Sequence, residues 1–479
     1  MNILIPLVPH TTRHDKGMSR GFTNASFPLG VSYVVAAIRK RIPEATIRVA
    51  GFDIDGVDHP DEIRRELKGI GRDFRPDFIM FGGMITRYHF IVNLSRISRE
   101  LFPKATQILG GGASSWGHEL FFDEAPIDYF TVGQAEESVI AILRGQPESN
   151  FGVVSATRRN PGVKQFLANL DEIGIPSHKD FRVQDYLSIQ KRITGWRTMP
   201  IVASRGCPFL CHFCTPSASV LRMRSPESVI EEFRLLKTDY QVDSVYFWDE
   251  LQFVKKPWFE DFCNKLLKAN LGLKWTMVTR ASLMKEQDVP LLKLAHKAGC
   301  MRVAIGIESG SPKILKAMNK NTPVDAMEGA LRRARACGIK ATGSMLLGFP
   351  GESQSTVQES IDFANRNLLE TSFYNLIPLP GAEVYEEYCK HRNLIPDPKS
   401  YMYKVSTAGG DASNIIMNLT EMSDSEYIEA TRRANMSVRK FGINDSIRYY
   451  GISGGLRHQA RALVNRARRK MSGRMFDTP

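Results

Sequence analysis

The sequence has few cysteines, and none of the seven lies before position 207. Seven in 479 residues exclude a small disulfide-stapled scaffold, because such scaffolds are short and dense in cysteine. No apolar run is long enough to span a bilayer. The start, MNILIPLVPH, has neither the basic region nor the apolar length of a signal peptide. We therefore expect a cytoplasmic protein.

Several common patterns are also missing. The chain has no G-x-G-x-x-G, so a nicotinamide-binding fingerprint is not supported. It has no repeat of solenoid period and no low-complexity tract. What remains is an ordinary globular composition, 43% hydrophobic and 24% charged, in a chain long enough for two or three domains.

Residues 1–150 alternate short apolar runs with stretches whose apolar residues recur at helical spacing. This alternation predicts an open parallel sheet with helices on both faces, a Rossmann-like or flavodoxin-like α/β domain. The expected strands cover residues 2–8, 46–54, 77–83, 106–112 and 128–133.

The alternation stops at residues 151–195, which we expect to form a linker with a short helix. It resumes over residues 196–400 with six strand candidates, two fewer than a full eight-stranded barrel. Residues 401–479 predict a small helical region with a basic tail. The six strand candidates cover residues 200–206, 244–250, 274–280, 302–310, 341–349 and 372–380.

Three cysteines, Cys207, Cys211 and Cys214, share one loop after the first strand of the second alternation. Their spacing is C-x3-C-x2-C, and Gly206 opens the loop. Three thiolates from one loop can hold three irons of a [4Fe–4S] cluster and leave the fourth iron free. A structural zinc site would need a closed set of four ligands. His212 as the fourth ligand would strain the loop.

A C-x3-C-x2-C loop after the first strand of six βα units resembles the radical S-adenosylmethionine (SAM) superfamily. The resemblance covers roughly residues 196–400. It implies that the free iron is chelated by the amino and carboxylate groups of SAM, and that the reduced cluster cleaves SAM to a 5′-deoxyadenosyl radical. That radical abstracts a hydrogen atom from the substrate. In this interpretation the three cysteines are the catalytic and metal-binding residues.

The same resemblance implies SAM-binding roles for charged residues at strand ends. Asp249 and Glu250 stand where the family places acceptors for the methionyl ammonium group. Arg280 stands where a guanidinium can pair with the SAM carboxylate.

Further SAM contacts are implied at the fourth and fifth strands and in the cysteine loop. Glu308 matches the position that holds the ribose hydroxyls or the methionyl group. Gly348 and Pro350 resemble the turn that lines the adenine, and Phe213 resembles the aromatic residue whose backbone meets it. The other four cysteines, from Cys263 onward, are expected to be small core residues.

The N-terminal part resembles the cobalamin-binding domain that precedes many radical SAM domains. Glycines at strand ends would let the backbone approach a flat macrocycle. The D-x-H-x-x-G motif, whose histidine ligates cobalt, is absent. Many members of this class lack that motif, so its absence leaves cobalamin binding open. The alternative is a degenerate domain that only packs on the barrel. The residues expected to contact cobalamin are Gly30, Met84, Ile85, Thr86, Gly111, Gly112, Ala113 and Gly133.

Together the two resemblances imply a cobalamin-dependent radical SAM enzyme. The leading reaction is methylation of an unactivated carbon, with the methyl group passing from SAM through cobalt. The alternative is a cobalamin-assisted cyclisation or rearrangement without methyl transfer, on a lipid or tetrapyrrole-like hydrophobic substrate. A third hypothesis, of another class, is a non-catalytic cobalamin sensor. The enzyme hypotheses require a small-molecule substrate and an electron donor such as flavodoxin or ferredoxin.

The net charge of +13 gathers partly in the last part of the chain. Residues 455–470 place four apolar side chains near one helical face and most of their basic residues elsewhere. Such a segment could lie on an anionic membrane surface, which would make the protein peripheral at the inner membrane and would suit a hydrophobic substrate. The alternatives are a terminal helix with a solvated cationic face and, less favoured because no recognisable motif accompanies the charge, nucleic acid.

Overall fold

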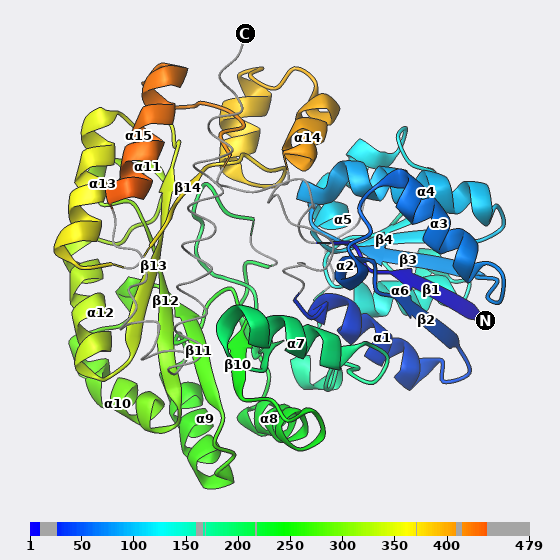
Figure 1. The fold of residues 1–479 in the computed structure, drawn as a ribbon, viewed down its shortest axis with the longest axis horizontal. Coiled ribbons are helices and arrows are strands. Elements are labelled where there is room, and N and C mark those ends of the chain that lie inside the picture. The colour runs from blue at the N-terminus through cyan, green and yellow to red at the C-terminus, as the bar shows by residue number, and fades with distance from the viewer. Residues whose placement is uncertain are drawn as a thin grey trace.

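The fold consists of two six-stranded, mainly parallel sheets that lie side by side, as a computed structural model shows (Figure 1). The structure describes residues 1–9, 26–159, 166–167, 169–215, 218–369, 371–408 and 414–437. The basic tail, for which membrane contact is one hypothesis, lies outside these residues.

The N-terminal sheet has six strands in the order β2-β1-β3-β4-β5-β6. The first five strands along the chain pair in parallel, and β6 pairs with β5 in the antiparallel sense. The order 2-1-3-4-5 is that of flavodoxin-like sheets, in which ligands bind outside the carboxyl ends near the β1/β3 switch point. The strands are β1 (Asn2–Pro6), β2 (Thr46–Ala50), β3 (Phe78–Gly82), β4 (Thr106–Gly110), β5 (Tyr129–Thr131) and β6 (Val153–Val154).

Helices cover both faces of this sheet, with α1 packed beside α6 and α3 beside α4. Helix α3 shows why these segments start where they do: Pro60 fixes its first turn, and the His59 side chain accepts a hydrogen bond from the Asp61 amide. The helices are α1 (Leu29–Arg41), α2 (Phe52–Asp55), α3 (Pro60–Ile70), η2 (Ile85–Arg87), α4 (Tyr88–Leu101), α5 (Gly111–Gly117), η3 (His118–Phe121), α6 (Ala135–Leu143) and η4 (Pro147–Ser149).

The second sheet confirms the six predicted βα units. All its strands are parallel, in the order β14-β13-β12-β11-β10-β7, which is the open partial barrel expected. Along β12 buried and half-buried side chains alternate, as they do when one face of a strand meets helices and the other lines a barrel interior. The strands are β7 (Thr198–Ile201), β10 (Ser244–Phe247), β11 (Lys274–Thr279), β12 (Cys300–Glu308), β13 (Lys340–Leu347) and β14 (Phe373–Asn375).

The barrel strands are joined by helices along the outer wall (Figure 1). Helix α8 begins with Ser225, whose side chain caps the amide of Ser228. A two-stranded antiparallel ribbon, β8 (Ser204–Arg205) with β9 (Arg222–Met223), stands between β7 and α8. The helices are α8 (Pro226–Tyr240), α9 (Lys256–Ala269), η6 (Ala281–Leu283), η7 (Glu286–Asp288), α10 (Val289–Lys297), α11 (Pro312–Ala317), α12 (Val324–Ala336) and α13 (Gln354–Arg366).

The segment expected to be a linker contains η5 (Leu170–Glu172) and the twelve-residue helix α7 (Val183–Thr194). Helix α7 is docked: its Tyr186 is buried, and the Tyr186 hydroxyl donates to the buried Asp53 carboxylate at 2.7 Å. One apolar core runs from α1 and α6 through α7 into the barrel. The two sheets are therefore parts of one packed body.

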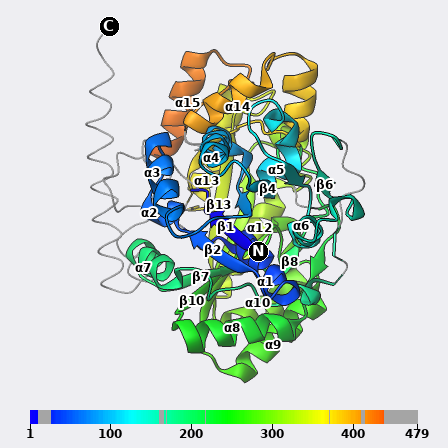
Figure 2. The ribbon, with the colours of Figure 1, turned by 90° about the vertical axis from the view of Figure 1, so that its right-hand side faces the viewer.

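The C-terminal part returns to the N-terminal domain. It contains the π-helix η8 (Val384–His391), α14 (Pro398–Thr407) and α15 (Asp424–Ser437). Helix α14 packs on α4 (Figure 2), while α15 packs on α13 and β14 (Figure 1). In the ranges that the structure describes, no helix combines the length and apolar character that crossing a membrane requires.

Candidate active site

The cysteine loop leaves the carboxyl end of the first barrel strand and is closed at its base by the β8/β9 ribbon. The Cys207 amide donates to the Ala218 carbonyl at 2.9 Å. Gly206 has a φ of +96°, and a Cβ atom there would overlap the Val220 carbonyl oxygen. Only glycine fits this corner without strain. The backbone of the ribbon therefore sets where the loop starts.

The three thiols of this loop are the accessible ones. Cys207 and Cys211 are half-buried and Cys214 is exposed, whereas the other four cysteines are buried, as expected for core residues. Desolvation raises the pKa of Cys207. Although the Cys214 side chain is exposed, the many surrounding protein atoms, with Cys211 next in effect, raise its pKa to about 12. These thiols must therefore lose protons to bind iron.

The donor set fits an iron–sulfur cluster. Three soft sulfur ligands lie in one loop, and they sense one another electrostatically. Within the described ranges, no three His, Cys, Asp or Glu side chains surround a single ion position. The prediction that these cysteines are ligands therefore rests on their loop, their spacing and their accessibility.

Arg280 lies against the cysteine loop. Its Nη1 atom is 3.5 Å from Cys211 Sγ, its guanidinium stacks 4.1 Å from the centroid of Phe209, and its Nε donates to Thr322. The residue is buried. Arg280 thus places a fixed positive charge beside one of the three sulfur atoms.

Asp249 has a different place from the one predicted. Its carboxylate is buried and accepts from the Ala203 amide at 2.9 Å and the Ser204 hydroxyl at 2.5 Å. Burial raises its pKa to about 7. The carboxylate therefore supports the connection between β7 and β8. The neighbouring Glu250 is exposed and acts electrostatically on the thiols of Cys207 and Cys214.

Glu308 ends β12 with a φ of +66°. Its carboxylate pairs with the buried Lys320 ammonium at 3.1 Å and accepts from the Ser344 hydroxyl at 3.4 Å. A Cβ atom at Gly306 would lie 2.5 Å from Glu308 Oε1 and 2.8 Å from Lys320 Nζ. Glycine therefore makes room for this ion pair on the interior face of β12.

The predicted adenine-lining residues meet in one small apolar cluster. Phe349, which lies between Gly348 and Pro350, belongs to this cluster, and Phe213 packs against the cluster. Gly348 has a φ of +98°, and its amide donates to Glu352 at 2.5 Å. This turn and the cysteine loop therefore meet at one apolar cluster, and SAM contact by these residues stays a prediction.

The residues predicted to contact cobalamin gather at the carboxyl edge of the N-terminal sheet. Met84 follows β3 and its side chain is 49% exposed, whereas Ile85 and Ala113 are buried in the core and support this edge from below. Gly111 and Gly112 open helix α5. At Gly111, which has a φ of +79°, a Cβ atom would lie 2.9 Å from the Gly83 backbone oxygen, so backbone packing requires this glycine. At Gly112 a Cβ atom would lie 3.2 Å from the sulfur of the exposed Met84 side chain.

Gly30 and Gly133 differ from that pair. A Cβ atom at Gly30, the second residue of α1, would meet nothing within 4 Å. Gly133 precedes α6 with a φ of +87°, and its amide donates to the Ser115 hydroxyl. Open space at Gly30, the half-buried Thr86 and the exposed Met84 fit a large ligand on this edge. Cobalamin contact by these residues stays a prediction.

The carboxyl edges of the two sheets face each other. Glu136, at the start of α6, pairs with Arg205 at the base of the cysteine loop at 2.8 Å. A Cβ atom at Gly381, after the last barrel strand, would overlap the ring of Trp116 in α5. The two predicted cofactor sites thus share one central region.

Sequence reasoning missed several residues of this region. Lys320, the partner of Glu308, carries no local pattern. Glu352 is fully buried beneath the predicted adenine turn. The basic residues that flank the cysteine loop, Arg205, Arg222 and Arg224, were visible beside the motif, but their partners in the N-terminal domain were not.

Comparison with known proteins agrees with this architecture. Residues 201–364 match the radical SAM superfamily. This match covers the cysteine loop and the strands β10 to β13, and the chain therefore contains a radical SAM domain. Such a domain is built to use a [4Fe–4S] cluster and SAM.

Two relatives extend the similarity beyond that domain. An uncharacterized methyltransferase of Pyrococcus horikoshii is 28% identical over 410 residues, which cover 82% of this chain and 84% of the relative. The anaerobic magnesium-protoporphyrin IX monomethyl ester cyclase of Cereibacter sphaeroides is 25% identical over 335 residues. That similarity covers 66% of this chain and 54% of the cyclase, so this chain spans about half the length of that relative.

The whole fold has a solved counterpart. The cobalamin-dependent SAM radical enzyme OxsB, solved with aqua-cobalamin and SAM bound, superposes with a TM-score of 0.64 at 17% identity. The superposition covers 93% of this chain and 62% of that chain. The arrangement of an N-terminal flavodoxin-like sheet on a radical SAM partial barrel is therefore shared with a cobalamin-dependent enzyme.

Proposed function

We propose that this protein is a cobalamin-dependent radical SAM enzyme that methylates an unactivated carbon of a small molecule. The observation that carries the proposal is the meeting of the two carboxyl edges, with Glu136 paired to Arg205 directly before the cysteine loop. The fold of OxsB and the name of the Pyrococcus relative support it.

When bound, the cluster with SAM would supply an adenosyl radical and cobalamin would supply a transferable methyl group. The residues of this chain would hold and orient these groups. Cys207, Cys211 and Cys214 would ligate the cluster, and Arg280 would fix the charge beside it. Glu308, already oriented by Lys320 and Ser344, would turn its carboxylate toward SAM. Keeping reactive groups positioned and shielded from water is the part that a protein plays in radical chemistry.

The second candidate is cyclisation or rearrangement without methyl transfer. It is favoured by the similarity to the protoporphyrin cyclase, which extends over 66% of this chain. Both candidates use the same cysteine loop and the same N-terminal edge. The products formed from SAM distinguish them.

The first experiment is cofactor analysis of protein purified without oxygen from cells supplied with cobalamin. We expect iron in the ratio of a [4Fe–4S] cluster per chain and stoichiometric cobalamin. With SAM and a low-potential reductant, methylation predicts S-adenosylhomocysteine in an amount equal to the bound cobalamin, as well as 5′-deoxyadenosine. Cyclisation predicts 5′-deoxyadenosine without S-adenosylhomocysteine.

Two cysteine variants control this experiment. Cys211→Ala should lose iron and both SAM products, whereas Cys263→Ala, a change in a buried core cysteine, should keep them. Iron without cobalamin in the wild-type protein would overturn the methylation proposal. Retention of the biological activity in a variant lacking all three loop cysteines would instead support a non-catalytic sensor.

We also propose a small one-electron protein such as flavodoxin or ferredoxin as the electron donor, because the cluster needs a low-potential reductant. Membrane-surface contact through the basic tail, which would make the protein peripheral, remains a separate proposal. Truncation after Asp445 should abolish binding to anionic vesicles if the tail carries it. Unchanged binding would contradict this.

A further inference from the structure

Three arginines flank the cysteine loop at its base. Arg205 lies two positions before Cys207, while Arg222 and Arg224 follow the loop, and Arg205 pairs with Arg222 across the β8/β9 ribbon. All three reach residues of the N-terminal domain: Tyr33, Gln134 and Glu136. The base of the loop is therefore an interface between the two sheets.

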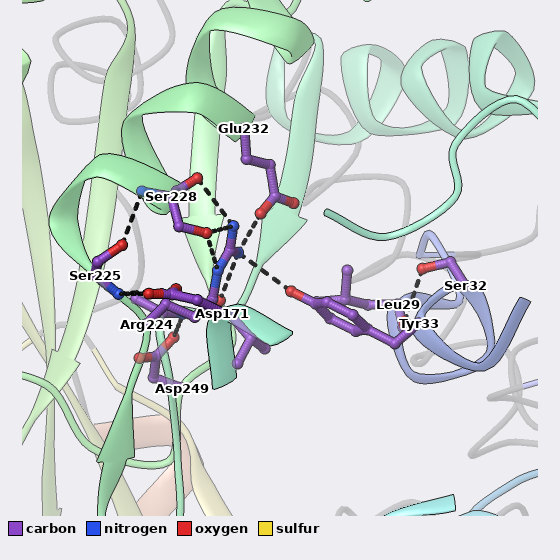
Figure 3. A network of polar contacts seen from close by, with 11 residues as sticks. Leu29, Ser32, Tyr33, Asp171, Arg224, Ser225, Ser228, Glu232 and Asp249 are labelled. Carbon is purple, nitrogen blue, oxygen red and sulfur yellow. Dashed lines mark hydrogen bonds and ion pairs between the residues drawn. The ribbon is translucent and has the colours of Figure 1, made fainter. Parts of the chain in front are cut away.

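Arg224 is the centre of a buried polar network (Figure 3). Its guanidinium pairs with the Glu232 carboxylate of α8 and donates to the Tyr33 hydroxyl of α1 at 3.2 Å. The same Nη1 atom donates to the Val202 carbonyl at 3.1 Å, and the Arg224 amide donates to the Ala203 carbonyl at 2.8 Å. Arg224 thus joins α1 to the strand that leads into the cysteine loop.

Arg205 makes a second joint beside the first. Its guanidinium pairs with Glu136 at 2.8 Å and lies 4.9 Å from the centroid of the Tyr33 ring. Tyr33 is therefore held by two arginines, one at its hydroxyl and one at its face. Burial, with the nearby Glu232, raises the pKa of Tyr33, so its hydroxyl stays neutral. The oxygen of this neutral hydroxyl accepts the hydrogen bond from Arg224.

These contacts are costly to build. The attraction between two buried charges offsets their desolvation free energy only when the geometry and the hydrogen bonds are good. Apolar side chains of similar size often stabilise a fold equally well. One oxygen of the Glu232 carboxyl has no hydrogen-bond partner among the described residues. Stability alone therefore does not account for this network, whose charged contacts hold α1, α8 and the start of the cysteine loop together.

The positions of the partners show what this geometry relates. Tyr33 follows Gly30 by three residues on α1, and Glu136 follows Gly133 by three residues at the start of α6. Both glycines belong to the predicted cobalamin edge. On the other side, Arg205 directly precedes the loop of Cys207. Links between the two predicted cofactor sites therefore run through these side chains.

We propose that Tyr33 and Glu136, held by Arg205 and Arg224, are positioning residues that fix the cysteine loop relative to the N-terminal edge. This proposal rests on the proposed function for its catalytic meaning. Their role is to fix the distance and orientation between the site of radical formation and the group bound on the N-terminal edge. Without the contacts of Tyr33 and Glu136, both cofactors stay bound, but SAM is cleaved to 5′-deoxyadenosine without an equivalent transfer of methyl groups.

The test uses Tyr33→Phe, which keeps the ring beneath Arg205 and removes only the hydroxyl, and Glu136→Gln, which removes the charge. Tyr186→Phe is the matched control, because it also deletes a buried hydroxyl, bonded to Asp53, but touches no residue of the loop base. Hydrogen–deuterium exchange of residues 207–215 should speed up by roughly twofold to tenfold in the two variants, the effect of losing one buried hydrogen bond. The control should leave this exchange unchanged.

A second readout is specific to positioning. We expect wild-type iron and cobalamin contents in both variants, but an altered magnetic interaction between cob(II)alamin and the reduced cluster in electron paramagnetic resonance. The ratio of 5′-deoxyadenosine to S-adenosylhomocysteine should rise by a similar factor. A variant that does not fold would be replaced by the other, since the two lie on different helices.

The outcomes separate the two proposals. If the wild-type protein binds no cobalamin, the proposed function fails, and exchange of the loop still decides whether Tyr33 and Glu136 hold it. If cobalamin is bound but exchange and magnetic interaction are unchanged in both variants, the positioning role is overturned. The same change in the Tyr186→Phe control would also overturn it.

Discussion

At the scale of single residues, Arg280 places a positive charge beside the cysteine loop. Its Nη1 atom lies 3.5 Å from Cys211 Sγ. One elementary charge at this distance, at an effective dielectric constant of about 20, should move a one-electron potential by about 200 mV. We therefore expect Arg280→Met to lower the reduction potential of the cluster by this order, measured by a redox titration followed by electron paramagnetic resonance.

Arg280→Lys is the matched control, because it keeps the positive charge but not the stacking on Phe209. It should stay closer to the wild-type potential than Arg280→Met does. Equal potentials in all three proteins would show that the guanidinium does not act on the cluster.

Glu352 gives a prediction on pH and stability. Burial raises its pKa from the usual 4.5 to about 8. Between these two pH values the folded protein keeps a proton that the unfolded chain releases. The contribution of this group to stability is therefore present in full below pH 4.5 and is lost as pH rises through about 8.

Glu352→Gln mimics the protonated carboxyl and should remove this loss. We expect the variant to match the wild type at the acid end of the window and to be the more stable protein at its alkaline end, measured by urea unfolding. Glu119→Gln, at an exposed glutamate, should follow the wild-type curve. A constant difference between Glu352→Gln and the wild type across the window would contradict the assignment.

The positions of these residues along the fold could be predicted from the sequence, whereas the partners of their side chains could not. Strand-end position predicted that Asp249, Arg280 and Glu308 would gather near the cysteines. It did not predict that Asp249 would turn toward Ala203 and Ser204, because position along a strand does not determine the choice of partner. Lys320 was not predicted, because no local sequence pattern around Lys320 or Glu308 indicates that the two side chains form an ion pair.

At the scale of elements, the β8/β9 ribbon sets the cysteine loop, and Gly206 is its corner. Gly206→Ala would combine a strained φ of +96° with an overlap on the Val220 backbone. We expect this variant to lose most of its bound iron while remaining folded. The measurement is iron content beside far-ultraviolet circular dichroism.

Gly145→Ala is the matched control for that change. Gly145 has a φ of +71°, but a Cβ atom there would meet nothing within 4 Å. Its cost should be limited to backbone strain of about 1–2 kcal/mol, without loss of iron. Equal iron loss in both variants would show that strain, not the overlap at the ribbon, is responsible.

The elements themselves were predictable wherever they repeat a pattern. Apolar runs of strand length alternating with helical stretches predicted all six barrel strands and the five parallel N-terminal strands. Strand β6 was missed because it has two residues and pairs antiparallel. The packing of α7 was missed because the partner of Tyr186 is Asp53, far away along the chain.

At the scale of the whole molecule, one apolar core connects α1 and α6 to the barrel. We therefore expect a single cooperative unfolding transition. Tryptophan fluorescence, which reports mainly on the barrel because only Trp116 lies in the N-terminal domain, should change together with far-ultraviolet circular dichroism. Separate midpoints would show that the domains unfold independently.

Helix α14 has a consequence for how this architecture can be recombined. The Ser406 hydroxyl of α14 lies 2.6 Å from the His89 ring on α4, and the rings of Tyr403 and Tyr88 meet edge to face. The N-terminal domain is thus held by two other parts of the chain. One is the base of the cysteine loop, and the other is α14, almost four hundred residues after the first strand. A chimera that exchanges only the first domain between relatives would replace one side of both contacts, that with the loop-base arginines and that with α14. The unit that can be exchanged is therefore discontinuous in sequence. A functional chimera should receive the N-terminal domain together with the α14 and the loop-base arginines of the same protein.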